Sequence, residues 1–290
     1  MRTVALMAVL AAAAAGQQVE KNLVYARAGE TELLLDLYRP EKAAGPLPVV
    51  VWIYGGAFRA GSKDDRQTAG ATWLTEHGYA VAAFNYRLSQ VAQWPAQAYD
   101  CKAAVRWLRA NAGRYGLDAG KMAAWGASAG GHLAAMLGTS GGVAELEGDL
   151  GNPDQSSRVQ AVVDFFGPTD FLQMDRQALV GGMKHDPADS PESQLIGGPI
   201  QENREKTGRA NPAAYATADD PPFLILHGDR DPLVPVGQSE ILFEALKKAG
   251  VSVTFHKLVG AGHGGKEFQG VLVRSVVLAF LDEQLKGRGK

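Results

Sequence analysis

The pentapeptide Gly126-Ala127-Ser128-Ala129-Gly130 lies between a short apolar run and a stretch of small residues with helical spacing. In this context the G-x-S-x-G pattern predicts a sharp turn from a strand into a helix, with the serine at the apex in a strained backbone conformation. Such a turn raises the serine Oγ clear of the sheet, and it needs flanking glycines because a Cβ would clash there. The pattern therefore predicts a layered α/β structure with an exposed nucleophile.

Apolar runs and amphipathic segments alternate along the chain. NLVYARAGETELLLDLYRP predicts a hairpin that turns at Ala28-Gly29-Glu30, and PLPVVVWIYGG is a continuous apolar run typical of a strand buried on both faces. Similar runs recur at YAVAAFNY, KMAAWG, VQAVVDFFG, PPFLILHG and VSVTFHKL, and helices are predicted at 98–112, 236–249 and 268–285. This alternation predicts an α/β fold in one domain, residues 17–290, with a mostly parallel central sheet and helices on both faces.

The composition is that of an ordinary globular enzyme. Of the 290 residues 46% are hydrophobic and 21% are charged. The net charge of -2 shows no excess of basic residues, so we expect no binding to nucleic acid or to an anionic membrane. Cys101 is the single cysteine and lies on the apolar face of a predicted helix, so we expect a buried structural thiol. The oligomeric state is left open by these features.

The N-terminus, MRTVALMAVLAAAAAGQQ, has a basic start, an apolar core and a run of small residues. This order predicts a secretory signal peptide over residues 1–16 and a secreted or periplasmic protein. The alternatives are a disordered alanine-rich tail or a helix of the mature fold. No other apolar run is long enough to span a membrane.

The segment 171–210 interrupts the alternation, because it is rich in Met, Gly, Pro and charge and has no clean period. It lies between two predicted strands, so we expect a short cap insertion over the functional site. The alternative is a surface insertion without such a role.

Two later motifs complete a candidate catalytic triad with Ser128. A serine is a poor nucleophile at neutral pH, so it needs a base within hydrogen-bond reach and an acid that orients the base. His263 is the candidate base, because it lies in a glycine-rich loop after the last apolar strand. Asp231 is the candidate acid in a stiff turn after an earlier strand, and its rivals are Asp229 and Asp170.

An ester hydrolase must also stabilise the negative charge that develops on the carbonyl oxygen. The backbone N–H of Ala129 would lie at the positive end of the helix that follows the serine. The small residues Gly55-Gly56-Ala57, directly after a predicted strand, would present further N–H groups.

With these motifs the chain resembles the α/β-hydrolase superfamily, and within it bacterial esterases with an HGGG-type loop of the hormone-sensitive-lipase-like and BD-FAE-like (feruloyl and acetyl xylan esterase) groups. The resemblance implies that Gly56, Ala57 and Ala129 form the oxyanion hole and that Ser128, Asp231 and His263 form the triad. Two departures stand out: Tyr54 replaces the usual loop histidine, and Ala57 the third glycine. Ala127, where hormone-sensitive-lipase relatives carry Asp, favours the feruloyl and acetyl xylan esterase side.

Together these features predict a secreted serine carboxylesterase that needs no metal or cofactor. Its expected substrates are small-molecule or saccharide esters, with Phe58, Tyr86 and Trp94 as candidate pocket residues that could equally belong to the core. Amide hydrolysis of the arylformamidase or peptidase type uses the same triad and is one alternative. A binding protein on an inactive hydrolase scaffold is the other.

Overall fold

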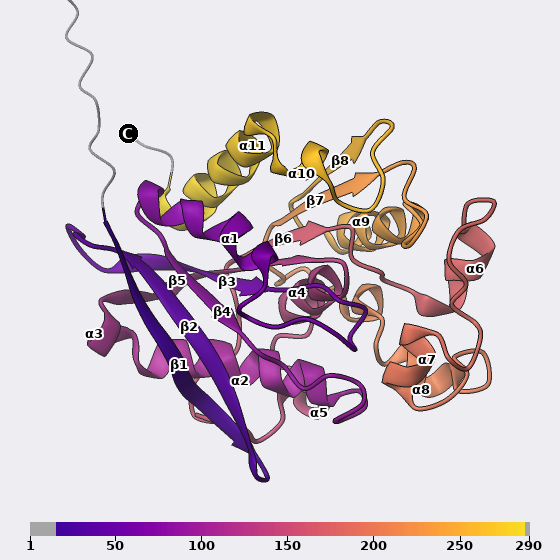
Figure 1. Cartoon of the computed structure of the whole chain (residues 1–290), viewed down its shortest axis with the longest axis horizontal. Coiled ribbons are helices and arrows are strands. Elements are labelled where there is room, and N and C mark those ends of the chain that lie inside the picture. The colour runs from indigo at the N-terminus through magenta and orange to yellow at the C-terminus, as the bar shows by residue number, and fades with distance from the viewer. Residues whose placement is uncertain (1–15, 288–290) are drawn as a thin grey trace, which may run out of the picture.

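A single eight-stranded sheet organises the molecule (Figure 1), and the computed structural model describes residues 16–287. Its strand order is β1-β2-β4-β3-β5-β6-β7-β8. β1 and β2 form an antiparallel hairpin, β2 pairs antiparallel with β4, and all remaining neighbours are parallel. The strands are β1 Gln17–Ala28, β2 Thr31–Pro40, β3 Leu47–Ile53, β4 Ala80–Phe84, β5 Leu117–Ala127, β6 Ala161–Phe165, β7 Phe223–Gly228 and β8 Val253–Leu258.

Helices lie in the connections between the strands and after the last strand. They are α1 Arg66–Thr72, α2 Ala96–Ala110, α3 Ala112–Tyr115, α4 Ala129–Thr139, α5 Ala144–Glu147, α6 Met174–Gln177, α7 Pro191–Ile196, α8 Arg204–Gly208, α9 Gly237–Ala249, α10 Lys266–Gln269 and α11 Val271–Leu281. Short 3₁₀ turns span Trp73–His77, Phe171–Gln173 and Pro212–Tyr215, and a π turn at Asp282–Lys286 follows α11.

Two apolar layers cover the two faces of the sheet, because successive side chains of a strand point to opposite faces. In β3, Val49, Val51 and Ile53 pack into the layer beneath α2, α4 and α9, whereas Val50 and Trp52 pack into the layer beneath α1 and α11. All seven residues of β3 are buried, as expected for a central strand covered on both sides. The predicted fold class, a mostly parallel sheet between helices, is confirmed.

The predicted segments agree with the structure apart from one helix. The hairpin turns at Gly29, whose φ of 60° suits a residue without a Cβ. The single helix predicted over 268–285 is wrong, because the backbone is extended at Gly270, with φ of -66° and ψ of 158°, and separates α10 from α11. The apolar spacing continues across this break, so it could not be recognised from periodicity.

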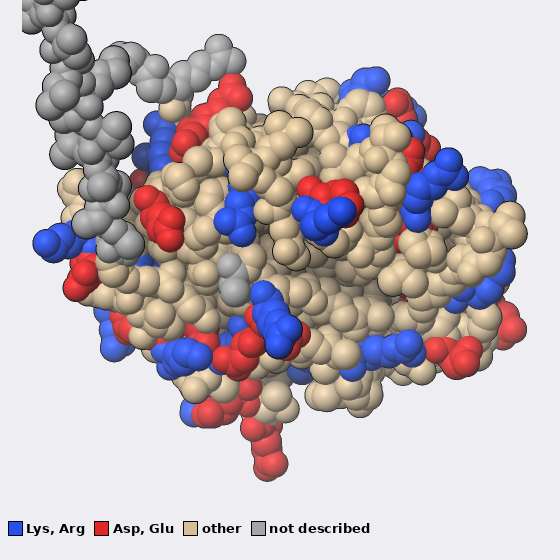
Figure 2. Space-filling model, turned by 45° about the horizontal axis from the view of Figure 1, so that its top comes forward, with Lys and Arg blue, Asp and Glu red and all other residues tan. Residues whose placement is uncertain are grey.

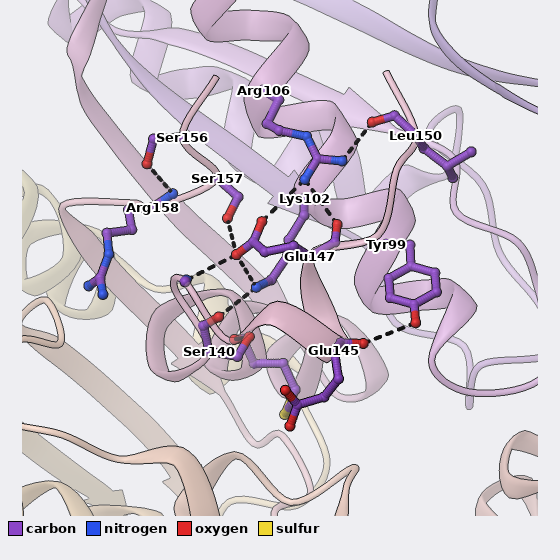
Figure 3. A network of polar contacts seen from close by, with 12 residues as sticks. Tyr99, Lys102, Arg106, Ser140, Glu145, Glu147, Leu150, Ser156, Ser157 and Arg158 are labelled. Carbon is purple, nitrogen blue, oxygen red and sulfur yellow. Dashed lines mark hydrogen bonds and ion pairs between the residues drawn. The ribbon is translucent and has the colours of Figure 1, made fainter. Parts of the chain in front are cut away.

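The network around Glu147 ties the α5 turn to α2 (Figure 3). Lys102 and Arg106 of α2 are almost fully buried and form ion pairs with the Glu147 carboxylate at 2.7 and 3.2 Å. The same carboxylate accepts hydrogen bonds from Ser157 Oγ at 2.9 Å and from the Gly142 N–H at 3.0 Å. Burial lowers the pKa of Lys102 and Glu147 raises it, with a net lowering. One half-buried carboxylate therefore pairs with two cations and accepts hydrogen bonds from two loops.

Apart from Gly16, the predicted leader over residues 1–16 lies outside the described residues. Within residues 16–287, no helix combines the length and the apolar character needed to cross a bilayer.

Candidate active site

The nucleophile turn follows from close packing around Ser128. Its backbone angles, φ of 57° and ψ of -123°, are strained for a residue with a side chain, and its N–H donates to Phe165 O at 2.8 Å. A Cβ on Gly126 would lie 2.0 Å from Gly130 O, and one on Gly130 would lie 2.0 Å from Ile53 O. Both glycines of the pentapeptide are therefore required by backbone contacts.

The structure brings Ser128, His263 and Asp231 into one hydrogen-bonded chain. His263 Nε2 lies 2.9 Å from Ser128 Oγ, and His263 Nδ1 lies 2.6 Å from Asp231 Oδ2. The loops after β7 and β8 that carry the acid and the histidine touch at Gly228, where a Cβ would lie 2.3 Å from Ala261 O. This geometry can activate a serine hydroxyl, because the acid fixes the imidazole tautomer with Nε2 toward the nucleophile.

Asp231 is held ionised by four polar neighbours. Its Oδ1 accepts hydrogen bonds from the N–H groups of Leu233 and Val234 at 2.8 and 2.9 Å, and its Oδ2 also lies 3.2 Å from Nε2 of His227. Burial raises the pKa of this carboxyl, but the hydrogen bonds from His227 and His263 and their charges bring it far below its ordinary value. The acid therefore stays negative throughout the pH range in which an imidazole titrates.

The two rival acids serve other loops. Asp229 Oδ1 accepts the Gly260 N–H at 2.7 Å, and Asp170 accepts bonds from the Leu172 N–H and from Gln173 Nε2. His227 supports the turn that carries Asp231, because its Nε2 lies 2.9 Å from Val234 O.

The loop after β3 has an unusual backbone beside Ser128. Gly56, Ala57 and Phe58 have consecutive positive φ angles of 128°, 55° and 61°, which residues with a Cβ rarely adopt. Gly56 and Ala57 line the same cavity as Ser128. Ala129 begins α4, where first-turn N–H groups have no carbonyl partner within the helix. An oxyanion hole needs main-chain donors next to the serine, so the assignment of Gly56, Ala57 and Ala129 to this role stays a prediction.

Tyr54, at the usual histidine position, supports this loop by packing. Its ring is stacked on Tyr86, with centroids 4.5 Å apart, and Tyr86 Oη donates to Tyr54 O at 3.2 Å. A Cβ on Gly61 would lie 2.6 Å from Tyr54 Cδ2, so the ring fills the space directly under the loop. Burial raises the pKa of Tyr54, which therefore remains a neutral phenol.

A cavity of about 650 Å³ opens at Ser128 between the sheet, α1, α10 and α11. Trp52 and Trp125, on neighbouring strands, form its floor with their rings edge to face at 5.1 Å. The aromatic residues around it are Trp52, Trp73, Trp125, Phe165, Phe166 and Phe268, and the long polar ones are Arg66, Gln67, Gln269 and Arg274. Figure 2 turns α11 toward the viewer and shows a mostly uncharged depression near the centre, with basic and acidic groups interspersed around it.

The three candidate pocket aromatics lie elsewhere, since none of Phe58, Tyr86 and Trp94 lines this cavity. Each is at most 3% exposed. Phe58 and Trp94 pack edge-on against the imidazole of His132 in α4, and Tyr86 packs on Tyr54. Their place in the structure is in the core, which was the alternative interpretation of these aromatics.

The segment 171–210 packs beside the acid loop. The Met183 N–H donates to Pro232 O at 2.8 Å, and the buried His185 contacts Leu233 O at 2.9 Å and Glu192 at 2.8 Å. Burial lowers the pKa of His185, but the hydrogen bonds to Glu192 and Leu233 and the nearby acidic charges raise it, with a net rise. Leu233 lines the cavity and no residue of 171–210 does, so a role as a cap over substrate stays a prediction.

Among the described residues there is no group of three or more histidine, cysteine or acidic side chains that could hold a metal ion.

Comparison with known proteins places the chain in a family. The BD-FAE family model matches residues 35–246. Esterase LipC of Mycobacterium tuberculosis (strain ATCC 25618 / H37Rv) is 32% identical over 236 residues, covering 80% of this chain and 56% of LipC. Esterase LipQ of the same organism is 31% identical over 240 residues, with 81% and 55% covered. The chain thus spans a little over half the length of these curated relatives.

Solved structures show the same architecture. A truncated form of a carbohydrate esterase from gut microbiota superposes with a TM-score of 0.85 at 33% identity, covering 94% of this chain and 98% of that one. Esterase Est2 of the Planctomycetes species Thermogutta terrifontis superposes with a TM-score of 0.73 at 26% identity, covering 96% and 95%. The protein has the α/β-hydrolase fold and belongs to the BD-FAE family.

Proposed function

We propose that the protein is a serine carboxylesterase that hydrolyses carboxylic esters through an acyl-enzyme. The observation that carries this proposal is the hydrogen-bonded chain Ser128–His263–Asp231, with distances of 2.9 and 2.6 Å, at the wall of an apolar cavity. The esterases among its relatives and structural neighbours support the same reaction.

The reaction follows from the positions of these groups. Ser128 Oγ attacks the ester carbonyl while His263 Nε2 takes its proton, and the carbonyl oxygen becomes an oxyanion held by backbone N–H groups. The carbon–oxygen bond to the alcohol then breaks, and His263 returns the proton to the leaving alkoxide. Water, deprotonated by the same imidazole, attacks the acyl-serine and releases the carboxylic acid and free Ser128.

We infer that the substrates are acetyl or feruloyl esters of plant-wall saccharides or other short-chain esters, and that the protein is exported. The order of basic, apolar and small residues in the first 16 positions supports export. The structural neighbour described as a carbohydrate esterase supports a saccharide ester. A cavity of about 650 Å³ with six aromatic rings on its walls has room for an aryl acyl group.

The test compares purified wild type with Ser128→Ala on p-nitrophenyl acetate through octanoate, methyl ferulate and acetylated xylan. We expect the wild type to hydrolyse ferulate or acetyl-xylan and the variant to lose this activity by several orders of magnitude. Activity on simple esters alone would contradict the saccharide-ester assignment. A wild type inactive on every ester would favour a binding protein on a hydrolase scaffold, and cleavage of amides in preference to esters would favour the amide hydrolase.

A further inference from the structure

Gln67, in the first turn of α1, joins the loop after β3 (residues 55–58, here called the oxyanion loop) to the wall of the Ser128 cavity. Its Oε1 accepts the backbone N–H of Gly55 at 3.1 Å, and Gln67 itself lines the cavity together with Ser128. A Cβ on Gly55 would lie 3.1 Å from Ser128 Cβ and 3.5 Å from Gln67 Oε1. Gly55 therefore adjoins both Ser128 and the Gln67 amide, and these two side chains line the same cavity.

The contact with Gly55 also fixes which way round the amide lies. Because the Gly55 N–H can only donate, the atom that faces it must be the carbonyl oxygen of Gln67, and Nε2 carries the two hydrogens on the other branch. Within residues 16–287 no acceptor bonds to that Nε2, and the side chain is exposed at the cavity. Accepting a bond at Oε1 polarises the amide and makes Nε2–H a stronger donor.

The hydrogen bond from Gly55 to Gln67 also limits which N–H groups of the oxyanion loop can bind a substrate. With its N–H bound to Gln67, Gly55 is not available to a substrate oxygen, so the main-chain donors nearest the serine on this loop are those of Gly56 and Ala57. The Gly55 bond also anchors the start of a loop whose next three residues have positive φ angles.

We propose that Gln67 is a further functional residue of the ester hydrolysis inferred above: its Oε1 positions the oxyanion loop, and its Nε2–H donates to the ester oxygen on which negative charge develops. The proposal rests on the proposed function. It assigns a side-chain donor in addition to the backbone donors of Gly56, Ala57 and Ala129.

Two substitutions separate the two halves of this amide. Gln67→Glu has nearly the same shape and keeps an oxygen for the Gly55 N–H, but it replaces the donor by a carboxylate oxygen. Gln67→Met fills similar space and removes both functions. Gln269→Glu is the matched control, because Gln269 of α10 lines the same cavity and measures what an added carboxylate on its wall costs. For each protein, kcat and KM on p-nitrophenyl butyrate and the melting temperature are measured.

We expect Gln67→Glu to keep the wild-type melting temperature and to lose about 100-fold in kcat, in line with the loss of an oxyanion donor, and at least tenfold more than Gln269→Glu. For Gln67→Met we expect a lower kcat than the wild type and also a lower melting temperature. If Gln67→Glu retains the wild-type kcat, changes only KM, or falls no further than Gln269→Glu, the donor role is wrong.

The same measurements distinguish a wrong esterase assignment from a wrong role for Gln67. A wild type that hydrolyses no ester, or a Ser128→Ala variant as active as the wild type, would overturn the esterase assignment and this proposal with it. An active, Ser128-dependent wild type with an unaffected Gln67→Glu variant overturns the role of Gln67 alone.

Discussion

His132, which lies in α4 four residues after Ser128, is expected to make the protein less stable in mild acid. It is fully buried in α4 behind the oxyanion loop, stacked on Phe171 with centroids 5.0 Å apart. Its Nδ1 lies 2.9 Å from Pro168 O, so Nδ1 carries the hydrogen, and within the described residues its buried Nε2 has no partner. Protonation would place a second N–H and a charge in this apolar site.

Burial lowers the pKa of His132 from 6.5 to about 4, while the bond to Pro168 raises it by less. Because the folded pKa is below the unfolded one, the unfolded state binds more protons between these values and stability rises with pH there. The contribution of neutral His132 to the free energy of unfolding is complete above pH 6.5 and is lost as the pH falls toward 4. At about 1.4 kcal/mol per pKa unit the loss at pH 4 is about 3 kcal/mol.

The assay is urea unfolding of wild type and His132→Asn at a series of pH values from 7.5 to 4. Asn places a donor near the Nδ1 position and does not titrate, so other groups contribute equally to both curves. We expect the variant to be less stable at neutral pH, because it loses ring contacts, and the difference to shrink by about 3 kcal/mol toward pH 4. Parallel curves, within about 1 kcal/mol, would refute this reasoning.

Two further substitutions test the close packing at the nucleophile turn and the ion pairs around Glu147. Gly126→Ala should destabilise the fold by more than about 3 kcal/mol, because its Cβ would meet backbone atoms 2.0 Å away; Gly113→Ala, with nothing within 4 Å, is the control, and equal melting temperatures for the two would contradict the account. Glu147→Ala should cost about 3 kcal/mol in chemical denaturation, because Lys102 and Arg106 lose their common counter-ion. A loss below about 1 kcal/mol would show that carbonyl contacts satisfy both cations.

Local signals predicted much of the fold and the triad positions. The hairpin at Gly29 and the buried β3 have short-range patterns, and Ser128 and His263 could be paired across 135 residues because each follows a strand whose carboxyl end reaches the same edge of the sheet. Strand order and the break at Gly270 have no comparable signal. The sheet order depends on contacts between segments far apart in the sequence.

The residues that line the cavity could not be predicted from the sequence, and the reason is physical. Trp52 and Trp125 lie in strands that are apolar on both faces, so no alternation marks which ring faces a ligand. Phe58 follows a glycine-rich loop and was expected at the pocket, but the positive φ angles of that loop turn its ring onto His132. Gln67 lies in no motif, and its contact with Gly55 depends on how α1 lies against the loop after β3.

The most direct test of the central claim is covalent labelling of Ser128. Paraoxon transfers a diethylphosphoryl group to an activated serine and releases one p-nitrophenolate, which can be counted, and peptide mass spectrometry locates the group. We predict one equivalent of p-nitrophenolate, a diethylphosphoryl group on the peptide that contains Ser128, parallel loss of esterase activity, and labelling slowed at least 100-fold in His263→Ala. Esterase activity that survives complete labelling, or a label on another residue, would contradict the account.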